Sequence, residues 1–121
     1  MEIPLIAVVD DDVGMRQSLE GLVRSLGYRA ALFDSAEQFF DAPEACLANC
    51  VITDLQMPGG MSGIDLANRV EARLKGRVIL LSAFLDDRVY LLAEAAGVCC
   101  FLRKPFDGER LIGCIEAALA A

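Results

Sequence analysis

Five short apolar segments, each followed by a segment with helical spacing, dominate the hydrophobic pattern of the chain. The apolar segments cover residues 4–9, 28–33, 50–53, 77–82 and 98–103. Their length is too short for helices, and the nearly continuous apolar character of most of them is typical of strands buried on both faces of a parallel sheet. We therefore expect five strands.

The segments between these strands carry apolar residues at helical intervals. We expect helices over residues 13–26, from 35 to about 43, 62–74, 86–96 and from 107 to the end of the chain. Ser35, Ser62 and Asp107 stand where a side-chain oxygen can cap a helix start. The third helix is expected to continue unbroken through Leu74 and to end before Gly76. Alternation of strands and helices predicts an α/β fold whose parallel sheet is covered on both faces.

Length and composition are those of one globular domain over residues 1–121. Of its 121 residues, 55% are hydrophobic and 24% are charged, which is enough for a sizeable core. The longest apolar stretches fall far short of the roughly 20 residues that span a bilayer, and Met1-Glu2 begins without a basic region. We expect a cytoplasmic protein with no membrane contact.

The charge balance argues against nucleic-acid binding by this chain. The net charge is −7, the isoelectric point is near 4.4, and the 11 basic residues form no cluster that could contact phosphates.

The five cysteines are predicted to be reduced thiols in the core. Their number is odd, no C-x-x-C pair is present, and the chain has no histidine to complete a zinc site. A redox role is the alternative. The five are Cys46, Cys50, Cys99, Cys100 and Cys114.

The stretch from Val51 to Pro58 carries the candidate chemistry. Its apolar run delivers one carboxylate, Asp54, to the end of a central strand, and Pro58 prevents continuation. Three of the other strands also end in polar residues, which are Asp10, Asp11 and Asp12 after the first, Ser82 after the fourth and Lys104 after the fifth. Because ligands bind at the carboxyl ends of strands in open α/β sheets, these side chains are expected to meet at one edge.

Such a group of side chains suits phosphoryl transfer. Three or more carboxylates in one crevice repel each other unless a cation joins them, and hard oxygen ligands favour Mg²⁺. Asp54 would be the nucleophile that attacks phosphorus, and Lys104 would supply a second positive charge.

Each residue also has a purely structural interpretation. Asp10 to Asp12 can cap the first helix, Asp54 can form a turn, Ser82 can bond to backbone, and Lys104 can be solvated. The pair Gly59-Gly60 lacks the spacing and the lysine of a phosphate-binding loop, so we interpret it as a flexible flank.

Four motifs in order resemble the receiver domain of bacterial two-component response regulators, and the resemblance covers nearly the whole chain. They are VVDDD, TDLQMPGGMSG, LLSA and FLRKPF. The chain is most similar to receivers of FixJ-like, LuxR-type transcription regulators. The resemblance implies a flavodoxin-like (βα)5 three-layer sandwich with strand order 2-1-3-4-5.

The resemblance also assigns roles to residues. It implies that Asp54 is the phosphoacceptor and that Asp10, Asp11 and the Gln56 carbonyl join it in binding Mg²⁺. Lys104 would contact the phosphoryl group. Ser82 and Phe101 would be the switch residues, with Phe101 moving inward when Ser82 turns toward the phosphate.

Two positions depart from the usual family pattern. The loop after Pro58 has Gly59-Gly60 where one residue is common, which would alter metal binding or autodephosphorylation. Ser82 lacks the methyl group that stiffens a threonine rotamer, so a weaker rotamer bias is expected.

A receiver implies a cognate sensor histidine kinase as partner. Phosphorylation would then change the face formed by residues 86–96, 98–103 and the last helix, which is the usual site of phosphorylation-dependent homodimers. Helix 86–96 carries Tyr90, Leu91 and Leu92, more apolar surface than one buried stripe needs. A well-packed helix is the alternative interpretation.

No output domain is found in the sequence. A DNA-binding domain beyond residue 121 is expected, with a stand-alone receiver as the alternative.

Two other functions compete with the phosphoacceptor receiver, which is not an enzyme. An aspartyl-phosphate hydrolase of the haloacid dehalogenase type would need a second Asp where Gln56 stands. A degenerate receiver would act as a protein-interaction module without phosphate.

Overall fold

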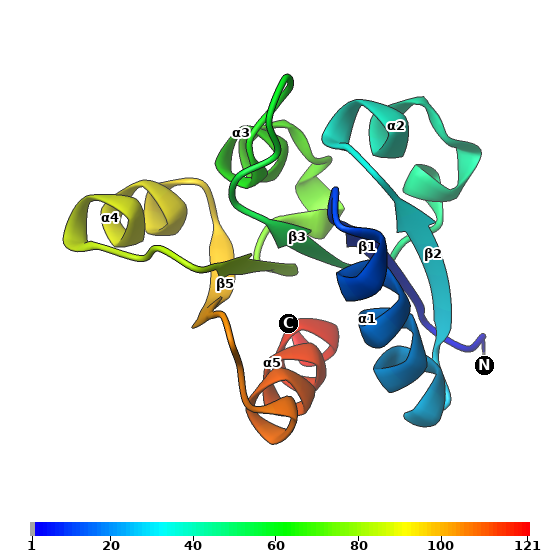
Figure 1. Ribbon diagram of the computed structural model, residues 1–121. Coiled ribbons are helices and arrows are strands. Elements are labelled where there is room, and N and C mark those ends of the chain that lie inside the picture. Colours follow the sequence, from blue (N-terminus) through cyan, green and yellow to red (C-terminus); the bar gives the residue numbers. More distant parts are fainter. Residues whose placement is uncertain (1) are drawn as a thin grey trace.

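Five parallel strands form one sheet in the order β2-β1-β3-β4-β5, as the sequence predicts. The computed structural model describes residues 2–121. The strands are β1 (Leu5–Val9), β2 (Arg29–Phe33), β3 (Cys50–Asp54), β4 (Val78–Ser82) and β5 (Val98–Arg103). The expected flavodoxin-like α/β fold is confirmed (Figure 1).

The helices follow the strands in alternation. They are α1 (Val13–Ser25), α2 (Ala36–Asp41), α3 (Gly63–Arg69), α4 (Asp87–Ala95) and α5 (Gly108–Ala120), with 3-10 turns η1 (Pro43–Cys46) and η2 (Ala72–Leu74). Ser35, Ser62 and Asp107 cap α2, α3 and α5 through their side chains, as predicted. Across residues 2–121, no helix combines the length and the apolar character that a bilayer crossing requires.

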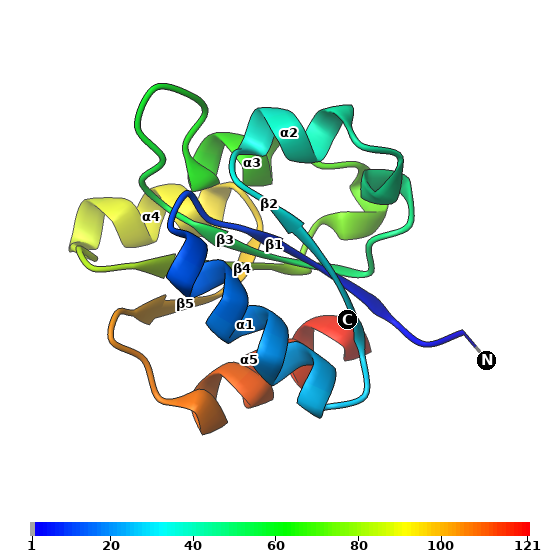
Figure 2. The ribbon, with the colours of Figure 1, turned by 45° about the vertical axis from the view of Figure 1, so that its right-hand side comes forward.

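Two layers of helices cover the sheet. Helices α1 and α5 lie on one face, and α2, α3 and α4 lie on the other (Figures 1 and 2). Successive strand residues point to opposite faces, so Ile6 and Val8 join the core under α1 and α5, whereas Ala7 and Val9 join the other core. Burial on both sides explains why β1, β3 and β4 are almost entirely apolar.

The third helix is shorter than the sequence predicts, which corrects the expectation of one helix through Leu74. The backbone at Val70 is extended, with φ −65° and ψ 153°, and η2 follows as a separate turn. The Lys75 ammonium donates to the carbonyls of Ala67 and Asn68 at 2.7 and 3.1 Å. These bonds satisfy carbonyls that a continued helix would have used.

The prediction of core cysteines is correct for Cys50 and wrong for Cys46 and Cys99, which are exposed. Cys46 ends the surface turn η1. Cys99 lies at an irregularity in the β4–β5 pairing, where Val98 and Cys100 find partners on β4 and Cys99 does not. Cys100 and Cys114 are half-buried, and all five thiols are free.

Candidate functional site

Asp54 ends β3, the central strand, and its carboxylate lies at the edge where the order of the strands reverses. Its side chain is 13% exposed. Burial raises the pKa of Asp54, Lys104 opposes this shift, and the nearby Asp10 adds to it. The backbone N–H of the exposed Gln56 also favours the charged form of Asp54. The positive charge and hydrogen bonds around Asp54 therefore do not fully offset the cost of burying its negative charge.

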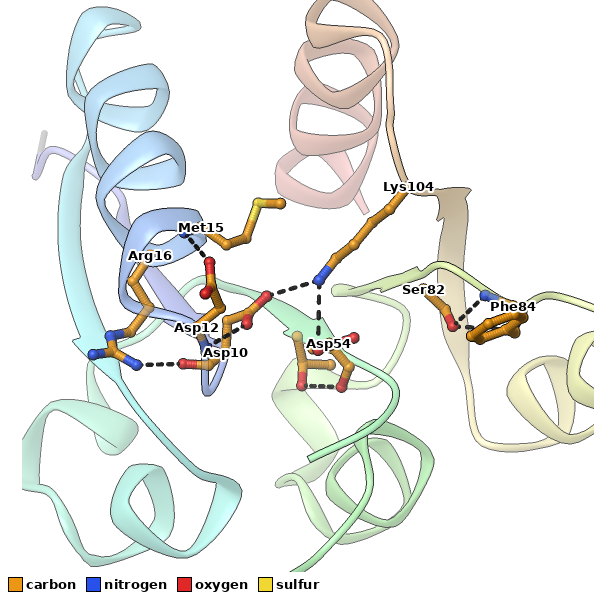
Figure 3. A network of polar contacts seen from close by, with 9 residues as sticks. Asp10, Asp12, Met15, Arg16, Asp54, Ser82, Phe84 and Lys104 are labelled. Carbon is orange, nitrogen blue, oxygen red and sulfur yellow. Dashed lines mark hydrogen bonds and ion pairs between the residues drawn. The ribbon is translucent and has the colours of Figure 1, made fainter. Parts of the chain in front are cut away.

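Lys104 bridges two carboxylates at this edge (Figure 3). Its Nζ lies 3.1 Å from Asp10 Oδ2 and 3.4 Å from Asp54 Oδ2. Burial lowers the pKa of Lys104, but its hydrogen bonds and the charges of Asp10 and Asp54 outweigh burial and raise the pKa overall. Lys104 is thus a fixed ammonium group in the site, and the interpretation of a solvated lysine is wrong.

The three acidic residues after β1 have different environments. Asp10 is 1% exposed, and its Oδ1 accepts the N–H of Asp12 at 2.9 Å. Asp12 caps α1, since its Oδ2 accepts the N–H of Met15 at 2.7 Å. Asp11 is exposed. The capping interpretation therefore holds for Asp12, while Asp10 and Asp11 remain available for the site.

The carboxylates of Asp10, Asp11 and Asp54 form an acidic cluster. One oxygen from each lies within 4.8 Å of the others. Mg²⁺ holds oxygens at about 2.0–2.1 Å, so ligands on opposite sides of the ion are about 4.2 Å apart. Hard oxygen donors at this spacing fit Mg²⁺ after a small contraction, and the repulsion between the carboxylates favours a cation.

Ser82 reaches the same sheet edge, but its hydroxyl bonds to Phe84 rather than to the acidic cluster. Its Oγ donates to the Phe84 carbonyl and accepts the Phe84 N–H, both at 3.0 Å (Figure 3). Ser82 is 1% exposed, whereas Phe84 is 69% exposed. In this structure Ser82 therefore follows the structural interpretation, in which its hydroxyl bonds to backbone at the end of the strand.

Phe101 lies on β5 and packs edge-on against Tyr90 of α4. The ring centroids are 4.5 Å apart with an interplanar angle of 69°. Phe101 is half-buried, while Tyr90, Leu91 and Leu92 are exposed. The well-packed interpretation of α4 is therefore wrong, because the helix presents an apolar surface to solvent.

Gly63 closes the loop that follows Asp54. Its N–H donates to the Leu55 carbonyl at 2.9 Å, and a Cβ at this position would lie 2.3 Å from the Asp54 carbonyl oxygen. Only glycine allows α3 to begin this close to the end of β3. Our sequence interpretation did not find this role, because GMSG resembles any flexible loop.

Arg16 is a second residue missed from sequence. Its guanidinium donates to the Asp10 carbonyl at 2.7 Å and so fixes the backbone from which the acidic residues project (Figure 3). The sequence could have indicated this role, because Arg16 stands four residues after the capping residue Asp12 and so lies on the same side of α1.

Comparison with known proteins agrees with this geometry. The family model described as "Response regulator receiver domain" matches residues 6–116. The transcriptional regulatory protein FixJ of Bradyrhizobium diazoefficiens is 41% identical over 116 residues, which are 94% of this chain and 56% of that protein. TdiR of Thauera aromatica is 35% identical, over 95% of this chain and 51% of that protein.

Solved structures show the same fold. The activated DrrB receiver domain has a TM-score of 0.86 and 28% identity, covering 99% of this chain and all of that chain. Full-length FixJ from B. japonicum has a TM-score of 0.83 and 36% identity, covering 99% of this chain and 59% of that one. The chain spans about half the length of the curated relatives it matches. It belongs to the family of response regulator receiver domains.

Proposed function

We propose that Asp54 accepts a phosphoryl group from a histidine kinase, and that this modification is the signal the domain transmits. The observation that carries the proposal is the placement of the Lys104 ammonium between Asp10 and Asp54, beside the acidic cluster. One nucleophile, one fixed cation and a set of oxygen donors are the groups that phosphoryl transfer requires.

The chemistry follows from the groups present. A carboxylate oxygen of Asp54 attacks phosphorus, an O–P bond forms, and the N–P bond to the kinase histidine breaks. Lys104 neutralises charge on the phosphoryl oxygens without moving far, because it already lies 3.4 Å from Asp54. Mg²⁺, held by Asp10, Asp11, Asp54 and the Gln56 carbonyl, would supply the remaining positive charge.

The switch that we propose starts at Ser82. A phosphoryl group on Asp54 offers new acceptor oxygens, and turning toward them takes the Ser82 hydroxyl away from both of its bonds to Phe84. Phe101 then moves inward and leaves its edge contact with Tyr90. The unphosphorylated and phosphorylated states would then differ in the face formed by α4, β5 and α5. Phosphorylation can shift the population between them because it favours only one of the two.

This face is our candidate for a phosphorylation-dependent homodimer. Leu91 is 68% exposed and Leu92 is 47% exposed, so α4 offers apolar area that a second copy could bury. Because the chain spans 56% of FixJ and 51% of TdiR, both named transcriptional regulatory proteins, we further propose that the domain controls a DNA-binding output domain.

Incubation with acetyl phosphate and Mg²⁺ tests the phosphoacceptor function. Intact mass spectrometry should show the gain of a single phosphoryl group. No kinase is needed, because Lys104 and Mg²⁺ neutralise the negative charge of the acetyl phosphate in the site. Chelation of Mg²⁺ with EDTA before the donor is added should reduce the gain at least about tenfold, since the acidic cluster then loses its counter-charge.

The alternative is a receiver that acts as an interaction module without phosphate. It predicts no mass gain in a folded protein and no carboxylate-dependent binding of Mg²⁺. The hydrolase alternative lacks its second acidic residue, since Gln56 occupies that position.

A further inference from the structure

The loop that follows Asp54 is tied to α2 by a single carboxylate. Glu37 lies in the first turn of α2, and its Oε2 accepts the N–H of Met61 at 2.8 Å. The two residues are 24 positions apart in the chain. The contact therefore joins a helix with no part in the acidic cluster to the loop that carries Gln56.

This contact is one of several that hold the loop. At the base, the Gly63 N–H donates to the Leu55 carbonyl at 2.9 Å. In the middle, Met57 is 6% exposed and belongs to the core under α2 and α3. Residues 58–60, which include Gly59-Gly60, are exposed, and after them Glu37 holds the Met61 backbone while the half-buried Met61 side chain packs against the same core. Ser62 and Asp65 then form the capping box that begins α3. Glu37 therefore supplies the hydrogen bond that ties the backbone beside the flexible glycine pair to α2.

Gly60 fits this arrangement because it has no side chain. A Cβ at Gly60 would lie 2.8 and 2.9 Å from the two carboxylate oxygens of Glu37. Gly59 has φ +84°, a backbone conformation that favours glycine. Gly60 thus leaves room for the Glu37 carboxylate, which holds the loop at Met61.

We propose that Glu37 is a positioning residue, which orders the loop over residues 56–61 and thereby sets the Mg²⁺ affinity of the phosphorylation site. Its effect on the metal rests on the proposed function, because it acts through the Gln56 carbonyl. A site whose ligand carbonyl is ordered before binding loses less conformational entropy when the ion binds.

Two substitutions at Glu37 separate the loss of the hydrogen bond from the loss of the negative charge. Glu37→Ala removes the acceptor, whereas Glu37→Gln keeps an oxygen that can accept the Met61 N–H. Hydrogen exchange followed by NMR without Mg²⁺ should show faster exchange of the Met61 amide in Glu37→Ala and near-normal exchange in Glu37→Gln. Calorimetric Mg²⁺ titration should show about three- to tenfold weaker binding in Glu37→Ala, as for the loss of one exposed hydrogen bond to a charged group.

A matched control and a double variant complete the test. Glu44→Ala removes the same charge from an exposed glutamate on η1 and should leave both readings unchanged. Gly60→Ala should act like Glu37→Ala, because its methyl group displaces the carboxylate. In the Glu37→Ala background, Gly60→Ala should add little, since the group it crowds is gone.

The possible results separate the two proposals. Wild-type Mg²⁺ affinity in Glu37→Ala, whether or not Met61 exchanges faster, would overturn the role of Glu37 and leave the phosphoacceptor function intact. Equal weakening in Glu37→Ala and Glu44→Ala would also overturn it, because a general charge effect would explain both. Failure of the wild type to bind Mg²⁺ would overturn both proposals.

Discussion

Asp54→Asn is expected to abolish phosphoryl uptake completely and to give a more stable fold. Asparagine preserves the shape of the side chain but has no carboxylate oxygen to attack phosphorus. Intact mass after incubation with acetyl phosphate and Mg²⁺ should stay at that of the untreated variant. Asp10 should not substitute, because it is 1% exposed and already bonded to Lys104 and to the Asp12 backbone.

The gain in stability follows from the raised pKa of Asp54. Burial and the nearby Asp10 raise this pKa above the value of the unfolded chain, with Lys104 opposing them. Between the unfolded and folded pKa values the native state binds more protons, so the native state loses stability as pH rises through that window. At neutral pH the charged Asp54 is destabilising, and Asn removes that effect.

Thermal unfolding measured as a function of pH tests whether the charged Asp54 destabilises the native state. The midpoint of Asp54→Asn should exceed that of the wild type at pH 7, and the difference should shrink as pH falls below the folded pKa of Asp54. Asp12→Asn is the matched control, because Asn is an equally good helix cap and this residue only caps α1. A variant at Asp12 that fails to take up phosphate, or an Asp54 variant that does, would contradict our assignment.

Gly63→Ala should destabilise the protein by about 2–4 kcal/mol, a large effect for one methyl group. The added Cβ would lie 2.3 Å from the Asp54 carbonyl oxygen and 2.7 Å from Leu80 Cδ1. The first of these neighbours is backbone of the central strand and cannot rotate away. Relief requires a shift of α3 away from β3, which would also disturb the backbone that positions the Asp54 carboxylate.

Gly113→Ala is the control for Gly63→Ala. Gly113 lies within α5, and apart from its chain neighbours and the nearby helix backbone nothing lies within 4 Å of a Cβ added there. Alanine should therefore stabilise the fold by about 0.5–1 kcal/mol through its better helix propensity. Urea unfolding measures both variants. Similar midpoints for the two would show that Gly63 has no special role.

Much of the fold was predictable because it follows from local pattern. Short apolar runs predicted all five strands, and the polar residues at the ends of four of them pointed to Asp54 and Lys104 as candidates. The order of the strands came from the family resemblance, since periodicity alone does not determine which strands pair. The contact between Lys104 and Asp10, 94 positions apart, follows once that order is known.

The remaining features depend on contacts between distant residues, which periodicity does not report. The end of α3 at Arg69 depends on Lys75 reaching back to helix carbonyls. The bond between Glu37 and Met61 joins the first turn of α2 to a loop 24 positions away, and no apolar pattern connects the two. The bonds from Ser82 to Phe84 are local, but the sequence does not specify a rotamer.

The location of the phosphoryl group is the most direct test of the account. Protein treated with acetyl phosphate and Mg²⁺ can be reduced with sodium borohydride, which converts an aspartyl phosphate into homoserine. Peptide mass spectrometry then identifies the modified position. We predict homoserine at position 54 alone. Homoserine at position 10 or 11, or at no position in a folded protein that binds Mg²⁺, would contradict the assignment of Asp54 as the phosphoacceptor.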